Sequence, residues 1–196
     1  MNLMIEPSHL QGTVIPPSSK SQTHRLLLAA ALAEGESTIE NVSFSQDVEA
    51  TLRCLEALGA AWERTEEQAV RVTGLAGAAA DGGALPLFDC GESGTTLRLV
   101  MPVALAITGG GVFKGRGRLL ERPLGPYRDL FTQKGIAWEE GADTVTLRGR
   151  LESGDFAMPG HVSSQFFSGL MMALPLLEGE SLVKAVTPLE SAGYLN

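Results

Sequence analysis

The chain has 196 residues, of which 44% are hydrophobic and 19% charged, and these proportions predict a globular protein with a substantial core. Its formal net charge of −8 argues against a broad basic surface for nucleic acid or for an anionic membrane. The two cysteines are too few for a disulfide framework or a structural zinc site, and the N-terminus lacks the pattern of a signal peptide. A cytoplasmic protein is therefore expected, in which any anion site gathers its cations locally.

The first predicted element is an apolar helix within residues 19–35, and charged residues stand at its N-terminus. Residues 16–25 read PPSSKSQTHR, so Lys20, Ser21 and Arg25 stand where the apolar run begins. A serine before an apolar helix is most often an N-cap, but capping requires neither a lysine nor an arginine beside it. Because helix N-termini attract anions, this cluster favours an anion site.

An amphipathic helix and a hairpin follow this first helix. Residues 47–63 read DVEATLRCLEALGAAWE, and after a polar turn the short alternating run 69–72 predicts a strand. Asp47 and Glu49 are interpreted as the cap and the first turn of the amphipathic helix.

The same order of elements then recurs. Apolar helices are predicted in ESGTTLRLVMPVALAITG (92–109) and VSSQFFSGLMMALPLLEG (162–179), and aligning Ser21 with Ser93 and Ser163 gives offsets of 72 and 70 residues. The amphipathic segment PLGPYRDLFTQKGIAWE (123–139) repeats 47–63 at an offset of 76, and strands are expected at 144–147 and 181–185. Chance resemblance between ordinary αβ units remains the alternative explanation.

These repeats predict an α/β (α+β) fold of βαβαββ units, with buried helices and outer sheets. The units cover about 13–75, 84–150 and 151–196. Helices that are apolar on every side must be surrounded by protein, so the three are expected to run side by side. Since a unit takes about 70 residues, the third is expected to be truncated, lacking its second helix and hairpin.

Parallel helices would bring their N-termini to one polar surface. The second helix would contribute Ser93, Gly94, Thr95, Thr96 and Arg98, and the third Ser163, Ser164 and Gln165. A further cluster, Arg116, Arg118 and Arg122, lies on the loop KGRGRLLERP. Each serine alone could be a simple cap, and Arg98 could equally pair internally or meet a ligand.

Other reactive residues are interpreted as structural. His24 in a first helical turn and Cys90 without a visible base are expected to take no part in chemistry. No P-loop or dinucleotide fingerprint occurs, and the histidines lack companions at ligand spacing, so neither a metal nor a cofactor is expected.

Taken together, the motifs resemble a known family. Lys20-Ser21 with Arg25, Gly91-Glu92-Ser93-Gly94-Thr95 with Arg98, Glu121-Arg122-Pro123, Ser163-Ser164-Gln165, and Ser191 with Tyr194 are similar, in order and spacing, to the N-terminal half of 5-enolpyruvylshikimate-3-phosphate synthases. The resemblance implies one domain of the enolpyruvyl transferase fold, an inside-out α/β barrel. It also implies a missing C-terminal domain as partner and no metal or organic cofactor.

The resemblance further implies a reaction and a set of contacts. The 5-hydroxyl of shikimate 3-phosphate attacks C2 of phosphoenolpyruvate while C3 is protonated, and phosphate then leaves. Lys20 would touch both substrates, and Ser21 and Arg25 would hold the shikimate carboxylate and ring. The remaining implied contacts are Ser163, Ser164, Ser191 and Tyr194 on the side of the shikimate phosphate, and Gly94, Arg122 and Gln165, with Glu92 and Arg118 nearby, for phosphoenolpyruvate.

Two departures from the family pattern stand out. Glu92 replaces a common Asn, so it is expected either to pair with a neighbouring arginine or to weaken binding of phosphoenolpyruvate or its analogues. Ala192-Gly193 replaces a basic residue and proline, which predicts a looser loop. Because the second domain of the family brings the acidic residues for proton transfer, the 196 residues alone are expected to bind shikimate 3-phosphate weakly, without turnover.

The sequence leaves three rival functions to compare with this one. A UDP-sugar enolpyruvyl transferase usually carries a cysteine on the loop that here reads GRGRLLERP. A repeat-built module could hold an anion at its helix N-termini without chemistry. An RNA-end-processing enzyme is disfavoured by the acidic charge and by the lack of interleaved aromatic and basic residues.

Overall fold

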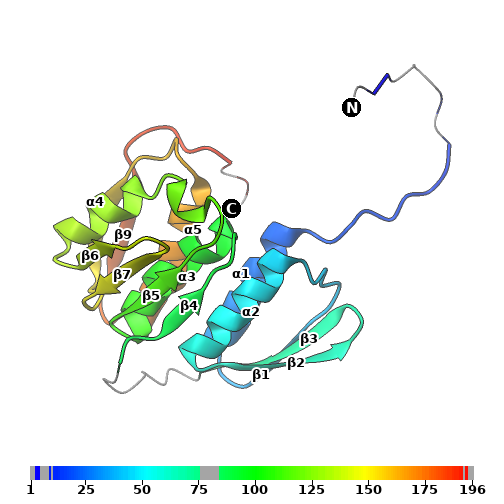
Figure 1. Ribbon diagram of the computed structural model, residues 1–196, viewed down its shortest axis with the longest axis horizontal. Helices are drawn as coiled ribbons and strands as arrows, with labels where there is room; N and C mark the ends of the chain where they lie inside the picture. Colours follow the sequence, from blue (N-terminus) through cyan, green and yellow to red (C-terminus); the bar gives the residue numbers. More distant parts are fainter. Residues whose placement is uncertain (1–2, 5–8, 10, 76–83, 192, 194–196) are drawn as a thin grey trace.

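The computed structural model describes residues 3–4, 9, 11–75, 84–191 and 193 (Figure 1). The first unit contains α1 (Lys20–Leu32), β1 (Glu36–Ile39), α2 (Gln46–Leu58), β2 (Ala61–Glu66) and β3 (Ala69–Thr73). The second contains β4 (Leu87–Asp89), α3 (Gly94–Ile107), β5 (Gly110–Lys114), the 3₁₀ turn η1 (Leu119–Glu121), α4 (Gly125–Gln133), β6 (Ala137–Glu140) and β7 (Thr144–Arg148). The third contains β8 (Gly154–Met158), α5 (Ser164–Ala173), the 3₁₀ turn η2 (Leu174–Leu176) and β9 (Ser181–Ala185).

Each unit has its own small sheet, which confirms the mixed α/β class. The strand orders are β1-β3-β2, β4-β5-β7-β6 and β8-β9. Strands β4–β5 and β8–β9 pair in parallel, while β1–β3 and β5–β7 pair antiparallel. The repeated tryptophans occupy matching places, since Trp62 lies opposite Val72 and Trp138 lies opposite Leu147.

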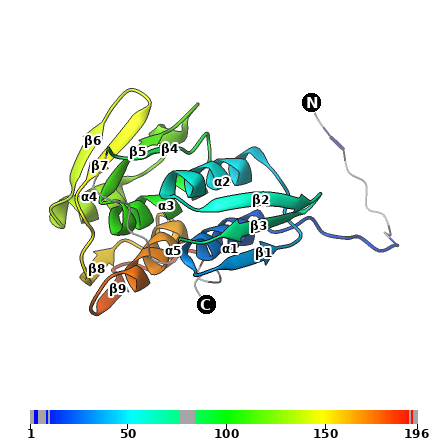
Figure 2. The same cartoon turned by 90° about the horizontal axis from the view of Figure 1, so that it is seen from below.

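The buried helices form the interior, and the sheets lie around them (Figures 1 and 2). One continuous apolar core joins all three units, including Leu28 of α1, Leu97 of α3 and Phe166 of α5, each fully buried. Burial of this apolar surface is the main favourable term in folding. The predicted helix layer with outer sheets is confirmed.

Two details of the prediction are wrong. The first unit was expected to open with a strand near residue 13, but no strand occurs in residues 11–18, where Val14 and Ile15 are 85% and 91% exposed. No described strand pairs with these residues, and an extended segment without a partner is not a strand.

The helices also differ in how far they are enclosed. No residue of α3 is exposed, as predicted, but Leu26 of α1 is 45% exposed and Met171 of α5 is 49% exposed. Both helices therefore have one side that no described residue covers.

Each predicted apolar helix was expected to end at a glycine in the left-handed conformation, and α3 does so, because Gly109 directly follows its C-cap Thr108 with φ of 69°. Gly35 and Gly179 are also left-handed, with φ of 78° and 92°, but they lie further along the chain than the ends of α1 and α5. Glycine adopts this left-handed conformation without the steric cost of a Cβ. Within the part of the chain described, no helix combines the length and apolarity needed to cross a bilayer.

Candidate functional site

The N-termini of α1, α3 and α5 are each capped by a serine. Ser19, Ser93 and Ser163 accept hydrogen bonds from the backbone N–H groups of Gln22 (3.3 Å), Thr96 (3.2 Å) and Gln165 (3.2 Å), respectively. The helix repeat therefore aligns Ser19, and not Ser21, with the two later caps. Because capping in α1 is performed by Ser19, the hydroxyl of Ser21 is left for another role.

A hollow of about 180 Å³ unites most of the residues predicted to hold shikimate 3-phosphate. It is lined by Ser21, Arg25, Val162, Ser163, Ser164, Gln165, Glu190 and Ser191. These residues come from α1, from the N-terminus of α5 and from the segment after β9, which are far apart in the sequence. Hydroxyls, a guanidinium and the N-terminus of α5 converge there, and this combination suits an oxyanion.

Arg25 is fixed at this hollow by bonds to both helices. Its Nη1 donates to the Ser21 carbonyl at 2.9 Å, and its Nη2 donates to Ser168 Oγ at 2.8 Å. Ser168 was not predicted as a site residue, because nothing in the sequence relates it to a residue 143 positions earlier. Glu190 was also missed, and its carboxylate gives the hollow an acidic edge.

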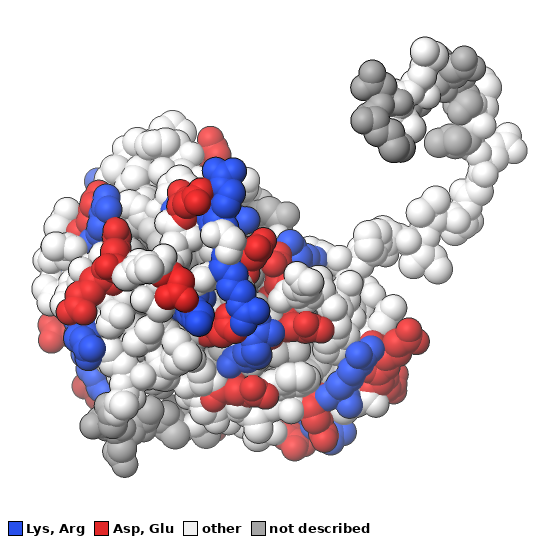
Figure 3. All heavy atoms as spheres, viewed as in Figure 1, with Lys and Arg blue, Asp and Glu red and all other residues white. Residues whose placement is uncertain are grey.

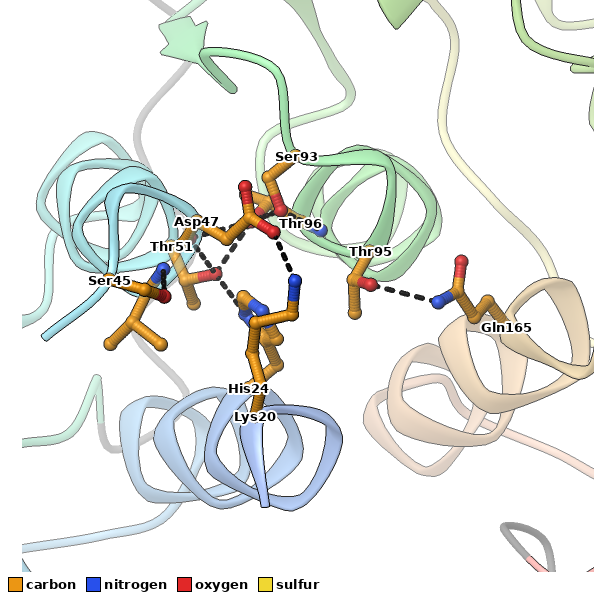
Figure 4. Close-up of polar contacts among 10 residues, drawn as sticks. Lys20, His24, Ser45, Asp47, Thr51, Ser93, Thr95, Thr96 and Gln165 are labelled. Atoms are coloured by element: carbon orange, nitrogen blue, oxygen red, sulfur yellow. Dashed lines mark hydrogen bonds and ion pairs between the residues drawn. The ribbon is translucent and has the colours of Figure 1, made fainter. Parts of the chain in front are cut away.

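Lys20 lies outside the hollow and pairs with Asp47 across the α1–α2 boundary (Figure 4). The Nζ–Oδ2 distance is 2.6 Å, and the lysine side chain is 55% exposed. The sequence was interpreted with Asp47 as the cap of α2, and this is wrong. The cap is Ser45, whose Oγ accepts a hydrogen bond from the Val48 N–H. An exposed pair of this kind is worth about 0–1 kcal/mol, so an anionic ligand could replace Asp47 at low cost.

A buried chain of polar side chains joins the same helix ends. His24 Nδ1 lies 2.7 Å from Thr51 Oγ1, which lies 2.7 Å from Thr96 Oγ1, and Thr96 donates to Ser93 Oγ at 2.8 Å (Figure 4). Burial lowers the pKa of His24 to about 4, with Asp47 opposing the shift. His24 is thus a neutral, structural side chain at neutral pH, which confirms the interpretation drawn from the sequence.

The side chain of Gln165 is held from two directions. Its amide donates to Thr95 Oγ1 at 2.8 Å, and its carbonyl oxygen accepts from Arg98 Nη1 at 2.9 Å. Arg98 also donates to the Pro123 carbonyl at 3.3 Å. Burial, together with Arg122, lowers the pKa of Arg98 below its usual value. Arg98 therefore makes internal bonds, one of the two alternatives left open by the sequence.

Of the residues predicted for phosphoenolpyruvate, Gln165 lines the hollow, and Gly94 and Arg122 lie against each other. A Cβ on Gly94 would stand 2.8 Å from Arg122 Nη1, so the absence of a side chain lets this guanidinium lie against the start of α3. Arg122 also lines a larger cleft of about 770 Å³ between residues 114–125 and the β6–β7 hairpin.

The two remaining residues predicted near phosphoenolpyruvate, Glu92 and Arg118, do not line the hollow. Arg118 pairs with Glu121 at 2.8 Å and is 88% exposed. Glu92 lies against Gly117, and no ion pair to it occurs among the described residues. Of the two alternatives left open for Glu92, pairing with a neighbouring arginine is therefore not found among the described residues. Tyr194 lies outside the described residues.

The surroundings of Cys90 make its thiol unreactive. Its Sγ lies 4.0 Å from Cys54 Sγ, and both cysteines are buried. The contact with Cys54, together with burial, raises the pKa of the Cys90 thiol well above its usual value. A protonated, buried thiol is a poor nucleophile, which agrees with its interpretation as a bystander.

Charge is interspersed over the face shown in Figure 3. Some Lys and Arg side chains form a narrow band near the middle of this view and others lie toward its two sides, with Asp and Glu side chains beside them. No broad basic surface appears on that face, in keeping with the net charge of −8.

Comparison with known proteins identifies relatives along nearly the whole chain. The sequence model of a family described as EPSP synthase (3-phosphoshikimate 1-carboxyvinyltransferase) matches residues 5–192. The chain is 41% identical over 194 residues to the 3-phosphoshikimate 1-carboxyvinyltransferase of Clostridium kluyveri, covering 98% of this chain and 45% of that protein. It is 38% identical over 205 residues to the protein of the same name from Clostridium novyi, covering 100% and 46%.

A solved structure gives the same result. The EPSP synthase of Acinetobacter baumannii superposes with a TM-score of 0.77 at 25% identity, over 92% of this chain and 41% of that one. The chain thus spans about half the length of the relatives that it matches.

Proposed function

The chain belongs to the EPSP synthase family, and from this we propose that it serves the transfer of the enolpyruvyl group of phosphoenolpyruvate to the 5-hydroxyl of shikimate 3-phosphate. In this proposal the 196 residues hold shikimate 3-phosphate at the helix N-termini. Turnover requires the further length that the relatives have, and the residues for proton transfer belong to that other half.

The observation that carries the proposal is the small hollow at the N-terminus of α5. Six of its lining residues belong to the predicted substrate-binding motifs, namely Ser21, Arg25, Ser163, Ser164, Gln165 and Ser191. They reach one place from three separate segments. Capping alone does not require this convergence.

Each group has a specific task in this proposal. The hydroxyls of Ser163, Ser164 and Ser191 bind the shikimate phosphate, aided by the positive end of α5. Arg25 binds the carboxylate and Ser21 the ring. Charge-assisted hydrogen bonds of this kind are about twice as strong as neutral ones.

Lys20 is proposed to contact both substrates by leaving Asp47. Its exposed ammonium lies at the ends of the same helices, and both substrates are anionic. Gly94, Arg122 and Gln165 are proposed to bind phosphoenolpyruvate, with Glu92 and Arg118 nearby, and Tyr194 to line the phosphate side of shikimate 3-phosphate. The carboxylate of Glu92, which has no ion-pair partner among the described residues, weakens phosphoenolpyruvate binding through like-charge repulsion.

Calorimetry with shikimate 3-phosphate tests the binding half of the proposal. Wild type is expected to bind, and Lys20→Ala is expected to weaken binding by tenfold or more with an unchanged melting temperature. Arg71→Ala removes one positive charge from an exposed pair in the first sheet, and it should bind like wild type. Equal affinity of Lys20→Ala and wild type would contradict the role of Lys20.

The Arg25→Ala variant is expected to change stability as well as binding, so the two effects must be separated. Since Arg25 bonds to both α1 and α5, its loss is expected to weaken both binding and stability. Arg25→Lys keeps the charge but loses the paired geometry, and it should still reduce affinity if the guanidinium binds a carboxylate.

The catalytic half is tested by complementation. The chain is mixed with the remaining part of the Clostridium kluyveri protein, and phosphate release from phosphoenolpyruvate plus shikimate 3-phosphate is measured. Turnover by the mixture and none by the chain alone supports the proposal. We further propose that no metal or organic cofactor takes part and that the protein works in the cytoplasm, so a chelator should not lower this rate.

A binding module without chemistry is the alternative function. It is favoured by one observation, that the anion-binding residues can be held by these 196 residues alone. Binding of inorganic phosphate as tightly as shikimate 3-phosphate, with no turnover on complementation, would favour the module. Binding of a UDP-sugar and not of shikimate 3-phosphate would favour the related UDP-sugar transferase.

A further inference from the structure

The hollow at the N-terminus of α5 receives its hydroxyls from two separate segments. Ser163 and Ser164 follow strand β8, and Ser191 belongs to the segment that follows strand β9. Because β8 and β9 pair in parallel, both segments leave the same end of their sheet (Figure 2). The spacing between the two sets of hydroxyls therefore depends on how residues 158–161 are joined to residues 186–190, and this contact is called the junction below.

Backbone hydrogen bonds continue across the junction beyond the ends of the strands. The Val186 N–H donates to the Met158 carbonyl at 3.0 Å. The Glu190 N–H donates to the Gly160 carbonyl at 3.1 Å. The approach is closest at Gly160, where a Cβ would stand 2.7 Å from the Thr187 carbonyl oxygen. Glycine lets two backbones come this near, and a side chain there would push the segments apart.

The hydroxyl of Thr187 is fully used within the junction. Its Oγ1 accepts from the Gly160 N–H at 2.8 Å and from the His161 N–H at 3.3 Å. Its own proton is left for His161 Nδ1, which lies 2.9 Å away, in the tautomer that carries the ring proton on Nε2. A hydroxyl offers one donor and two acceptor sites, so all three are occupied. Thr187 does not line the hollow itself, and any influence on a ligand passes through its neighbours.

The serine that reaches the hollow from this segment has an unusual backbone conformation. Ser191 has a φ of 55°, in the left-handed region that residues with a Cβ seldom adopt. Such a conformation persists where the surrounding structure holds it. The residue directly before it, Glu190, is held by the bond to Gly160. The direction of the Ser191 hydroxyl therefore depends on the junction.

We propose that Thr187 is a positioning residue that sets the distance between the Ser191 hydroxyl and the hydroxyls of Ser163 and Ser164. Correct spacing lets both segments bind one phosphate group at the same time, whereas wider spacing leaves one of them out of reach. Thr187 thereby contributes to the preference for a phosphorylated ring over the same ring without phosphate. The inference rests on the proposed function, because it assigns the hollow to the phosphate of shikimate 3-phosphate.

The test compares two ligands that differ only in the phosphate. Nuclear magnetic resonance titration of the chain gives dissociation constants for shikimate 3-phosphate and for shikimate, and their ratio reports the contribution of the phosphate. Thr187→Val keeps the branched shape but removes the hydroxyl. It is expected to weaken binding of shikimate 3-phosphate by about tenfold and binding of shikimate by less than about twofold. A change in stability alone would weaken both ligands alike.

Three further variants separate position from stability. Thr187→Ser keeps the hydroxyl and should restore the ratio of wild type. Gly160→Ala pushes the same two segments apart from the other side, and it should lower the ratio as Thr187→Val does. Thr146→Val is the matched control, because Thr146 is likewise partly buried but lies on β7 in the second sheet. It should bind both ligands like wild type.

The outcomes distinguish this inference from the proposed function. An unchanged ratio in Thr187→Val, or in Gly160→Ala should Thr187→Val fail to fold, would overturn the inference alone. An equal loss for both ligands that follows a lower melting temperature would do the same, since Thr187 would then only stabilise the fold. Absence of shikimate 3-phosphate binding by wild type would overturn the proposed function, and this inference with it.

Discussion

At the scale of single residues, the fold places a titratable group where only its neutral form is stable. His24 is fully buried, its Nδ1 contacts Thr51, and its Nε2 has no partner among the described residues. Burial lowers its pKa to about 4, whereas a histidine in the unfolded chain titrates near 6.5. Between pH 6.5 and about pH 4 the unfolded state therefore binds a proton that the folded state does not.

This difference predicts a pH-dependent stability. The contribution of neutral His24 to the free energy of unfolding is fully present above pH 6.5. It is lost as the pH falls toward 4, and the total loss is about 3 kcal/mol. Urea unfolding of wild type and His24→Asn at pH 7.5 and pH 4 should show a smaller loss for the variant. His161→Asn is the control, because His161 is exposed, and a loss equal to that of His24→Asn would contradict the assignment.

A second feature of this scale is the choice of cap. Ser19 caps α1 and Ser21 lines the hollow, although both serines precede the same apolar run. The sequence favoured Ser21 as the counterpart of the later caps. A shift of two residues in a helix turns a side chain by about 200°, so the correct register decides which hydroxyl faces a ligand.

At the scale of elements, a proline inside α3 explains why α4 packs where it does. Pro102 has no N–H to donate to the Arg98 carbonyl one turn earlier. Tyr127 of α4 donates to this carbonyl instead, and burial raises the pKa of Tyr127 well above its usual value, so the phenol stays protonated. Close packing of α5 follows from Gly169, where a Cβ would collide with Tyr127 Oη and the Arg98 carbonyl.

This arrangement predicts a coupling between two substitutions. Tyr127→Phe should lower the free energy of unfolding by about 1–3 kcal/mol, because it leaves a buried carbonyl without a donor. In a Pro102→Ala background the new N–H can serve that carbonyl, so the loss should shrink by 0.5 kcal/mol or more. Equal losses in both backgrounds, measured by urea unfolding, would mean that the hydroxyl acts only through Phe166.

At the scale of the whole molecule, the three units share one core. Fully buried residues from α1, α3 and α5 contact one another in a single apolar cluster. The sheets are small, with three, four and two strands, and each depends on the helix layer for burial of its inner face.

The shared core predicts one cooperative unfolding transition. Trp138→Phe leaves Trp62 as a reporter of the first sheet, and Trp62→Phe leaves Trp138 as a reporter of the second. Within each variant, the urea midpoint of tryptophan fluorescence is compared with the midpoint of helix loss by circular dichroism, so that differences in stability between the variants do not matter. The two midpoints should coincide in both variants. Separated midpoints within one variant would show that the units unfold independently, as in an extended repeat protein.

What the sequence by itself determined is the order of elements and the residues at the helix ends. Apolar periodicity, glycine stops and the repeated Gly-x-Ala-Trp-Glu are local signals, and local hydrogen bonding and burial respond to them directly. The same signals identified most residues of the hollow through their motifs, including Arg25 and Ser163.

Only the tertiary structure decided which of these residues meet. The partnerships of Lys20 with Asp47 and of Arg25 with Ser168 span 27 and 143 positions, and they depend on how helices pack against one another. The exposed sides of α1 and α5 were missed for the same reason. The sequence contains the same apolar residue whether a neighbouring element covers it or leaves it exposed. Burial depends on how the layers assemble, so the sequence pattern alone does not reveal it.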